Sequence, residues 1–146
     1  MAGIAHEGHK LTQATKSVSY TAQVWNSCKY WDEESGCSGG YDYPTRSSSI
    51  RINGTLKGDS TKVYIGGKKV SVNGGGTTEN DSWSQPSDYY SGVNLHSSSS
   101  GTISSGNSKG VYISGKLIAV KGSTVNTHEG VNTTIAEGSS KVFIGG

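Results

Sequence analysis

The chain has 146 residues and a formal net charge of +2, with 31% hydrophobic and 16% charged residues. This length suits one domain, and the low hydrophobic content excludes a large single core. The apolar residues are mostly β-branched, with 11 Val and 9 Ile against 4 Leu, which favours β-sheet and excludes a helical bundle. We therefore expect one all-β domain spanning residues 1–146.

The sequence also narrows the expected location and partners. No stretch approaches the roughly 20 consecutive apolar residues of a membrane helix. Residues 1–7 lack the basic and apolar segments of a signal peptide, so we expect none. The basic residues are scattered rather than clustered, so we expect no nucleic-acid partner.

The first predicted element is a short strand over residues 3–8. A long polar connection, residues 9–55, follows and carries most of the aromatic residues. Within it, residues 17–25 (SVSYTAQVW) alternate well enough to predict an additional strand. The other two connections, residues 75–102 and 123–134, are polar and rich in Gly and Ser, and we expect them to be loops.

An internal repeat organises the rest of the chain. Each copy has an aliphatic residue, a Gly-polar-Ser turn, a Val-aromatic-Ile strand and a Gly-containing turn, and in two copies a second strand follows. The Gly66-Gly67 and Ser114-Gly115 pairs are typical of hairpin turns, because such residues accept positive φ at low cost. The copies occupy residues 56–74, 103–122 and 135–146.

The third copy stops at its turn, and its second strand is found at the other end of the chain. Residues 4–8 (IAHEG) match residues 118–122 (IAVKG) in character. We therefore predict that residues 3–8 complete the third unit by pairing with the C-terminal strand. Such closure removes the open edges that short strands cannot safely leave exposed.

The repeat resembles the PAAR-repeat family, the small conical proteins that cap the spike of contractile injection machines. The resemblance rests on the Gly-x-Ser-x-x-Val-aromatic-Ile-x-Gly-Lys core at residues 58–68, 106–116 and 138–146, on the opening Met1–Ala5, and on the split third unit. It implies a non-enzymatic, PAAR-like spike tip that sharpens the machine for penetration of the target cell envelope. That machine would be a phage tail, a tailocin, a type VI secretion system or a related particle.

The same resemblance implies a partner and a location. The protein would be seated as a monomer on the blunt end of a trimeric β-helical spike, in a 1:3 complex. Three pseudo-repeats in one chain would match such a three-fold platform. The protein would be made in the bacterial cytoplasm and assembled at the distal end of the spike.

The resemblance further implies one structural metal ion, zinc or iron, near the tip. Members of the family commonly bind it with His and Cys side chains from the connections between repeats. The candidate ligands are His9 and Cys37 in the first connection, His96 in the second and His128 in the third. We expect His96 and His128 to lie close in space. Cys28 is the alternative to Cys37 as a metal ligand. The alternative to metal binding is that these side chains are separately solvated, with Cys28 and Cys37 free or disulfide-bonded.

His6 is not among these candidates. We expect it to be a half-buried strand residue, since it aligns with Val72 and Val120.

Two readings of the loop aromatics remain open. They could form a minicore, a small separate cluster of packed aromatic side chains beneath a long loop. We favour this reading because the core of the domain is small. They could instead make the protein a small β-rich glycan-binding module that uses Tyr30, Trp31, Trp83, Tyr89 and Tyr90. No Gly-x-Ser-x-Gly elbow is present, and the Gly-rich residues 74–78 lack the Lys of a phosphate loop, so we do not expect an enzyme.

Overall fold

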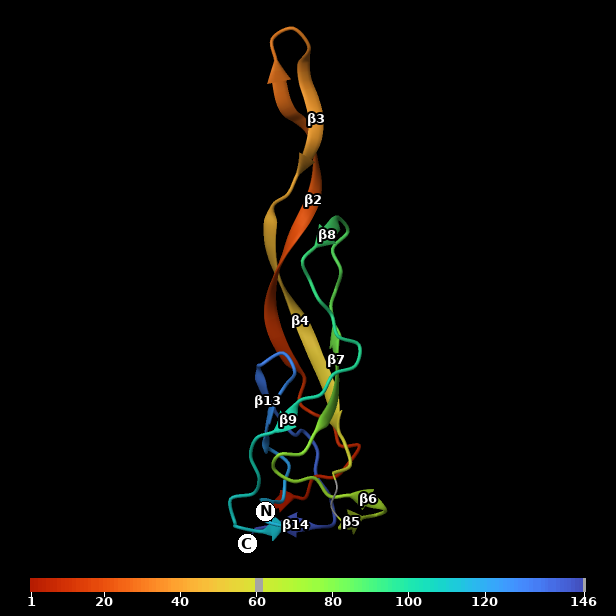
Figure 1. Ribbon diagram of the computed structural model, residues 1–146, viewed down its shortest axis with the longest axis vertical. Coiled ribbons are helices and arrows are strands. Elements are labelled where there is room, and N and C mark those ends of the chain that lie inside the picture. Colours follow the sequence, from red (N-terminus) through yellow and green to blue (C-terminus); the bar gives the residue numbers. More distant parts are fainter. Residues whose placement is uncertain (60–61, 146) are drawn as a thin grey trace.

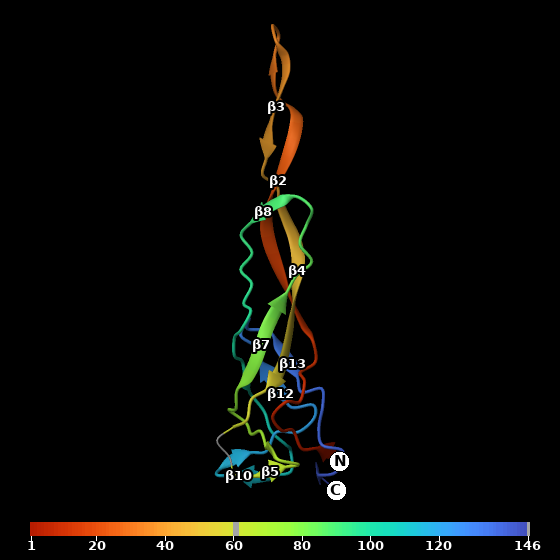
Figure 2. The ribbon, with the colours of Figure 1, turned by 90° about the vertical axis from the view of Figure 1, so that its right-hand side faces the viewer.

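The computed structural model describes residues 1–59 and 62–145. It is an elongated all-β structure with a broad base, where both termini lie, and a long, narrow two-stranded ribbon that projects from it (Figures 1 and 2). The described residues contain no helix of the length and apolarity needed to cross a membrane. Ser60, Thr61 and Gly146, which belong to the predicted repeats, lie outside the described residues.

Three short segments form a triangle at the centre of the base: residues 4–6, 70–72 and 118–120. Isolated antiparallel bridges join them in pairs, Ile4 to Val120, His6 to Val70 and Val72 to Ile118. Their middle residues are fully buried and bonded in a ring. The N–H of Ala5 donates to the carbonyl of Ala119, that of Ala119 to Ser71, and that of Ser71 to Ala5, over 2.9–3.0 Å. The three units are therefore related by a pseudo-three-fold axis.

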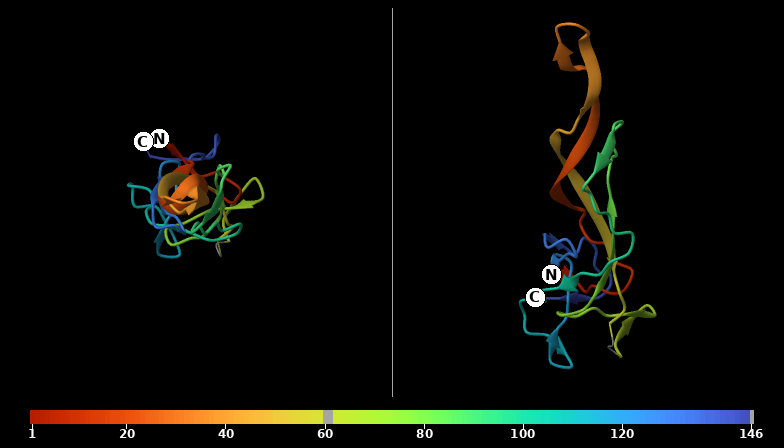
Figure 3. Two further views of the ribbon diagram at one scale, coloured as in Figure 1. Left: turned by 90° about the horizontal axis from the view of Figure 1, so that it is seen from above. Right: turned by 45° about the horizontal axis from the view of Figure 1, so that its top comes forward.

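Each side of the triangle carries one hairpin, and the three hairpins form three lobes around the axis (Figure 3). The first pairs β5 (Tyr64–Ile65) with β6 (Lys68–Lys69), and the second pairs β10 (Tyr112–Ile113) with β11 (Lys116–Leu117). The third pairs β14 (Phe143–Ile144) with β1 (Ala2–Gly3) from the opposite end of the chain. The predicted split of the third unit between the termini is confirmed.

The turns of the two continuous hairpins explain their sequence. Gly66 and Gly67 have φ values of 57° and 79°, and Ser114 and Gly115 have 50° and 80°. Two consecutive positive φ values define the tight turn whose twist matches that of paired strands. Ser114 is the only described residue other than glycine with positive φ.

The core is small and follows the same symmetry. Equivalent aliphatic residues of the three units, Leu56, Ile103 and Ile135, pack together with Ala5 and Ala119 on one side of the triangle. On the other side, towards the hairpins, a second cluster packs against the triangle: Ile4, Val70, Ile118, Val120 and Ile144. Small side chains in the ring itself allow the three backbones to approach closely.

Ser71 breaks this symmetry and provides a test of it. Its hydroxyl oxygen is buried without a hydrogen-bond partner, whereas alanine occupies the two equivalent positions. A buried polar group without a partner costs about 1–3 kcal/mol. Ser71→Ala is therefore expected to increase the free energy of unfolding by about 1 kcal/mol in urea denaturation. Because the structure requires a small residue there, Ser71→Val should destabilise the protein. A Ser71→Ala variant less stable than the parent would contradict the assignment of the Ser71 hydroxyl as a buried polar group without a hydrogen-bond partner.

The predicted loop over residues 9–55 is largely strand, which corrects the sequence-based expectation. It contains β2 (Ala14–Asp32), β3 (Gly36–Asp42) and most of β4 (Thr45–Leu56). The strand predicted at residues 17–25 lies within β2. Strand β2 pairs with β4 over residues 14–21 and with β3 over residues 24–32, so its last part projects with β3 alone beside it. At about 3.3 Å per residue, a 19-residue strand is about 60 Å long.

The connections over residues 75–102 and 123–134, which were expected to be loops, also contain short strands, which corrects that expectation. These strands lie around the end of the ribbon nearest the base, which we call its root. Strand β7 (Thr77–Ser82) pairs with β4, and β8 (Tyr89–Ser91) pairs with residues 21–23 of β2. Strands β9 (Thr102–Ile103), β12 (Thr124–Asn126) and β13 (Asn132–Thr134) form a separate sheet in the order β13-β12-β9. These elements stand between the triangle and the projecting ribbon (Figure 1).

The expected aromatic minicore forms only in part. Tyr20, Trp83 and Tyr90 contact one another edge to face, with ring centroids 4.8–6.3 Å apart. The indole N–H of Trp83 donates to the hydroxyl of Ser48 over 2.8 Å. Further along the ribbon the rings are exposed instead, as they are at Trp25, Tyr30, Trp31, Tyr41 and Tyr43.

Candidate metal centre

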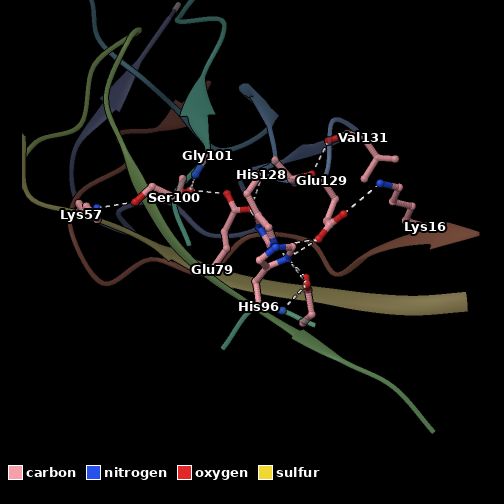
Figure 4. A network of polar contacts seen from close by, with 12 residues as sticks. Lys16, Lys57, Glu79, His96, Ser100, Gly101, His128, Glu129 and Val131 are labelled. Carbon is pink, nitrogen blue, oxygen red and sulfur yellow. Dashed lines mark hydrogen bonds and ion pairs between the residues drawn. The ribbon is translucent and has the colours of Figure 1, made fainter. Parts of the chain in front are cut away.

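Four side chains that can ligate a metal meet at the root of the ribbon. Asp81 belongs to β7, His96 to the connection between β8 and β9, and His128 and Glu129 to the turn between β12 and β13. One ligand atom from each lies within 4.8 Å of the other three. Figure 4 shows the two imidazoles together, with Glu79 to one side and Glu129 to the other.

The interatomic distances define a tight cluster. Nδ1 of His96 lies 3.0 Å from Oδ2 of Asp81 and 2.8 Å from Oε1 of Glu129. Nε2 of His128 lies 2.8 Å from Oδ1 of Asp81 and 3.4 Å from Oε1 of Glu129. The side chain of His96 is about half exposed, while the other three are at most 10% exposed. The cluster is therefore buried on three sides and open only at His96.

Glu79 fixes the orientation of the His128 ring. Its Oε1 lies 2.7 Å from Nδ1 of His128 and accepts the backbone N–H of the same residue over 3.0 Å. The carboxylate is fully buried, and its other oxygen accepts the hydroxyl of Thr77. An Nδ1–H donated to a carboxylate leaves the lone pair of Nε2 directed at the cluster. This is the usual arrangement of a histidine that binds a metal through Nε2.

The hydrogen bonding of two atoms in the cluster indicates whether the cluster fits a metal ion. Nε2 of His128 and Oδ1 of Asp81 are both buried without a hydrogen-bond partner, although they lie only 2.8 Å apart. Buried polar atoms are nearly always satisfied, so each such atom requires an explanation. A cation between a ring nitrogen and two carboxylates would satisfy both. The cluster could therefore hold a metal ion.

Chain topology explains why these side chains meet. Glu79 and Asp81 are two residues apart in β7, so the period of two in a strand places them on the same face. The turn that carries His128 and Glu129 closes with the N–H of Gly130 donating to the carbonyl of Thr127 over 2.9 Å. Nζ of Lys16, in β2, lies 3.0 Å from Oε2 of Glu129 and balances part of the negative charge.

The structure brings together two of the four ligand candidates predicted from sequence. His96 and His128 have ring centroids 5.3 Å apart, which confirms that they lie close in space. His9 instead stacks on His6, with centroids 3.7 Å apart, and its Nδ1 accepts the backbone N–H of His6. Cys37 is disulfide-bonded to Cys28 in the ribbon, so its sulfur is not a ligand here.

The carboxylates were the residues that sequence reasoning missed. Asp81, Glu129 and Glu79 lie in or next to segments that read as polar loops. The available signal was the pair of acidic residues two apart in Glu79-Asn80-Asp81, together with the acidic neighbour of His128. Neither pattern is specific without knowing which segments are strands.

The cluster shifts the pKa values of His96 and Asp81 in opposite directions. Hydrogen bonds to Asp81 and then Glu129 raise the pKa of His96 above its ordinary value of 6.5. Burial alone would raise the pKa of Asp81, but hydrogen bonds from the backbone and the ring of His96 outweigh it and lower this pKa below 3.8. Away from the cluster, burial and the nearby His6 lower the pKa of His9. Both shifts of the His96–Asp81 pair thus favour the charged form of each side chain.

These shifts predict how the stability of the metal-stripped protein depends on pH. The contribution of His96 is complete below pH 6.5 and is lost as pH rises through its raised pKa. That of Asp81 is complete above pH 3.8 and is lost as pH falls through its lowered pKa. Both are present between these values, so the melting temperature measured in chelator should be highest there. His96→Gln should remove the decline in melting temperature above pH 6.5. An unchanged decline would contradict the assignment of this pH dependence to His96.

Comparisons with known proteins give no relative for this chain. No family model, curated protein or solved structure matches it.

Proposed function

We propose that this protein is a PAAR-like spike tip, seated on the blunt end of a trimeric β-helical spike of a contractile injection machine. The observation that carries the proposal is the pseudo-three-fold base. A single chain that repeats the same hairpin three times around an axis offers three equivalent contacts to a three-fold partner.

The outer surfaces of the three hairpins support this docking. Each carries a Val-aromatic pair whose side chains are 39–58% exposed. We call these six residues the seat: Val63, Tyr64, Val111, Tyr112, Val142 and Phe143. Apolar side chains exposed at equivalent positions in all three units are typical of a protein interface. The matching surface would be the apolar end of a trimeric β-helix.

The shape of the rest of the molecule suits a mechanical role. The ribbon rises near the centre of the three lobes, on the side opposite the hairpins (Figure 3). It would be the first part to meet the target cell envelope when the spike is driven forward. This role requires no bond-making chemistry, and we propose a non-enzymatic protein.

We further propose that the cluster of Asp81, His96, His128 and Glu129 holds one structural zinc ion. Two imidazole nitrogens and two carboxylate oxygens are all common zinc ligands, and four protein ligands make the closed set of a structural site. The cluster joins the connection over residues 75–102, which contains β7, to the connection over residues 123–134. A zinc ion would therefore tie together the segments that support the root of the ribbon, where a small core supplies little packing.

The seat can be tested by mixing the protein with a trimeric β-helical spike protein of a contractile injection machine. Light scattering after gel filtration should give one tip per spike trimer. Replacing one aromatic of each hairpin with aspartate, as Tyr64→Asp, Tyr112→Asp and Phe143→Asp together, should abolish the complex while the protein stays folded. Tyr89→Ser, at another exposed aromatic remote from the base, is the matched control and should still bind. Binding by the triple variant, or no complex with the parent protein, would overturn the proposal.

A further inference from the structure

The end of the ribbon carries aromatic side chains that the fold does not need. Beyond residue 23, β2 is paired only with β3, so rings on this part cannot contribute to the core. Trp25 is 59% exposed and Trp31 is 72% exposed. Large exposed aromatic residues on a projecting element usually mark a contact surface.

Strand register places three of these rings on one face. Strand β2 has a register shift against β3 between Asn26 and Tyr30, but on either side of it Trp25 pairs with Tyr41 and Trp31 pairs with Cys37. Residues 37, 39 and 41 alternate onto one side of β3, so both tryptophans project on that side with them. We call Trp25, Trp31 and Tyr41 the aromatic strip. Cys37 and Tyr41 are four residues apart along β3, which separates the two ends of the strip by about 13 Å.

Gly39 lets the strip lie flat. A Cβ at this position would overlap Cζ2 and Cη2 of Trp25, so the indole lies directly on the backbone of β3. The opposite side of the indole remains open, and Tyr41 supports its edge with centroids 5.2 Å apart at 74°. The disulfide between Cys28 and Cys37 joins the two strands beside Trp31. The strip is thus held in place before any ligand arrives, which lowers the entropy cost of binding.

The surroundings of the strip favour one class of partner. Residues 25–43 contain no aliphatic side chain, so the surface lacks the residues that would enter the hydrocarbon core of a bilayer. The single basic residue, Lys29, lies 3.5 Å from Asp42, and the turn at the end of the ribbon carries Asp32, Glu33 and Glu34. This negative charge repels anionic lipids and acidic polymers, and it complements a neutral or amine-bearing ligand.

We propose that the aromatic strip binds a linear polysaccharide of neutral or amino sugars. The C–H face of a pyranose ring stacks on an open aromatic face, and a span of about 13 Å accommodates two to three consecutive sugars. Asn26 and Asp42, whose side chains lie 3.0 Å apart on the opposite face of the ribbon, belong to a separate polar contact and are not part of the strip. The proposal does not depend on the seat or on the metal.

Titration calorimetry with chitohexaose and with fully deacetylated chitohexaose tests the proposal on the intact protein. We expect binding to at least one of them, with a change in tryptophan fluorescence. Trp31→Ala should weaken binding at least about tenfold, the usual effect of removing a large aromatic contact. The matched control Tyr89→Ala, which removes a more exposed ring outside the strip, should change the affinity less than about twofold.

Three results would overturn the proposal. The first is no binding to either oligosaccharide or to a panel of neutral and amino-sugar polymers. The second is equal binding by Trp31→Ala and the parent protein. The third is binding to phosphatidylcholine vesicles that Trp31→Ala abolishes, which would identify the strip as a membrane contact.

Gly39→Val, which places a branched side chain under Trp25, should weaken sugar binding while leaving both strip tryptophans in the chain.

Discussion

Deletion of residues 1–8 is expected to leave a chain that does not fold. The deletion removes one side of the triangle, including Ala5, whose N–H and carbonyl both bond within the ring. It also removes Ile4 from the core and leaves β14 without its partner β1. Loss of a buried isoleucine costs about 2–5 kcal/mol, and each stranded buried backbone group adds about 1–3 kcal/mol. The total approaches the whole stability of a typical domain, about 5–15 kcal/mol.

Circular dichroism and gel filtration would measure the outcome of this deletion. The matched control is a circular permutant that joins the two termini, which lie side by side at the base (Figure 1), through a short glycine linker and opens the chain between Glu33 and Glu34. It retains every residue of the triangle, so it should fold. A folded, monomeric deletion variant would show that the third unit does not need residues 3–8.

Protein purified without added metal is expected to contain about one equivalent of zinc, and a chelator should lower its melting temperature by about 10 °C. Without a cation, two carboxylates and two imidazoles crowd within 4.8 Å, and Nε2 of His128 and Oδ1 of Asp81 lack partners. Loss of about 3–4 kcal/mol would produce this change, since 1 kcal/mol corresponds to about 2–4 °C at this chain length. Elemental analysis and differential scanning calorimetry measure the two quantities.

Variants distinguish the ligands from other residues. His128→Ala and Asp81→Asn should lose the metal and its stabilisation, whereas Glu79→Gln should weaken zinc affinity by about 10–100-fold, because it only orients His128. His9→Ala is the control, since this histidine stacks on His6 and lies outside the cluster. Its zinc content should match that of the parent. Less than about a tenth of an equivalent in the parent, with no effect of chelator, would leave the cluster a network of ion pairs.

The base of the molecule could be predicted from sequence because its information is local and repeated. Each hairpin turn has residues that accept positive φ, and each strand alternates in a short, recognisable motif. Repetition reinforced a pattern that would be weak in one copy. The likeness of residues 4–8 to residues 118–122 was enough to predict that β1 pairs with β14.

The ribbon was recognised only in part. The alternation in residues 17–25 predicted a strand, but the serine- and glycine-rich residues 36–49 do not favour a strand over a loop. They become strands because β2 supplies the hydrogen-bonding partner along its whole length, from β4 at the root to β3 at the end. Pairing of this kind is non-local, and residue propensity does not encode it.

The sequence by itself determined the all-β class and the three units, because β-branched residues and positive-φ turns act within a few residues of one another. It also determined their closure, because residues 4–8 repeat the motif of residues 118–122. Only the tertiary structure decided which side chains form the candidate metal cluster. His96 and His128 are 32 positions apart, and Asp81 and Glu129 join them because β7 and the turn between β12 and β13 converge on the root of the ribbon. Tertiary structure also separated Cys37 from this cluster and paired it with Cys28. Ligand identity depends on distances across the fold, and the order of residues along the chain does not fix those distances.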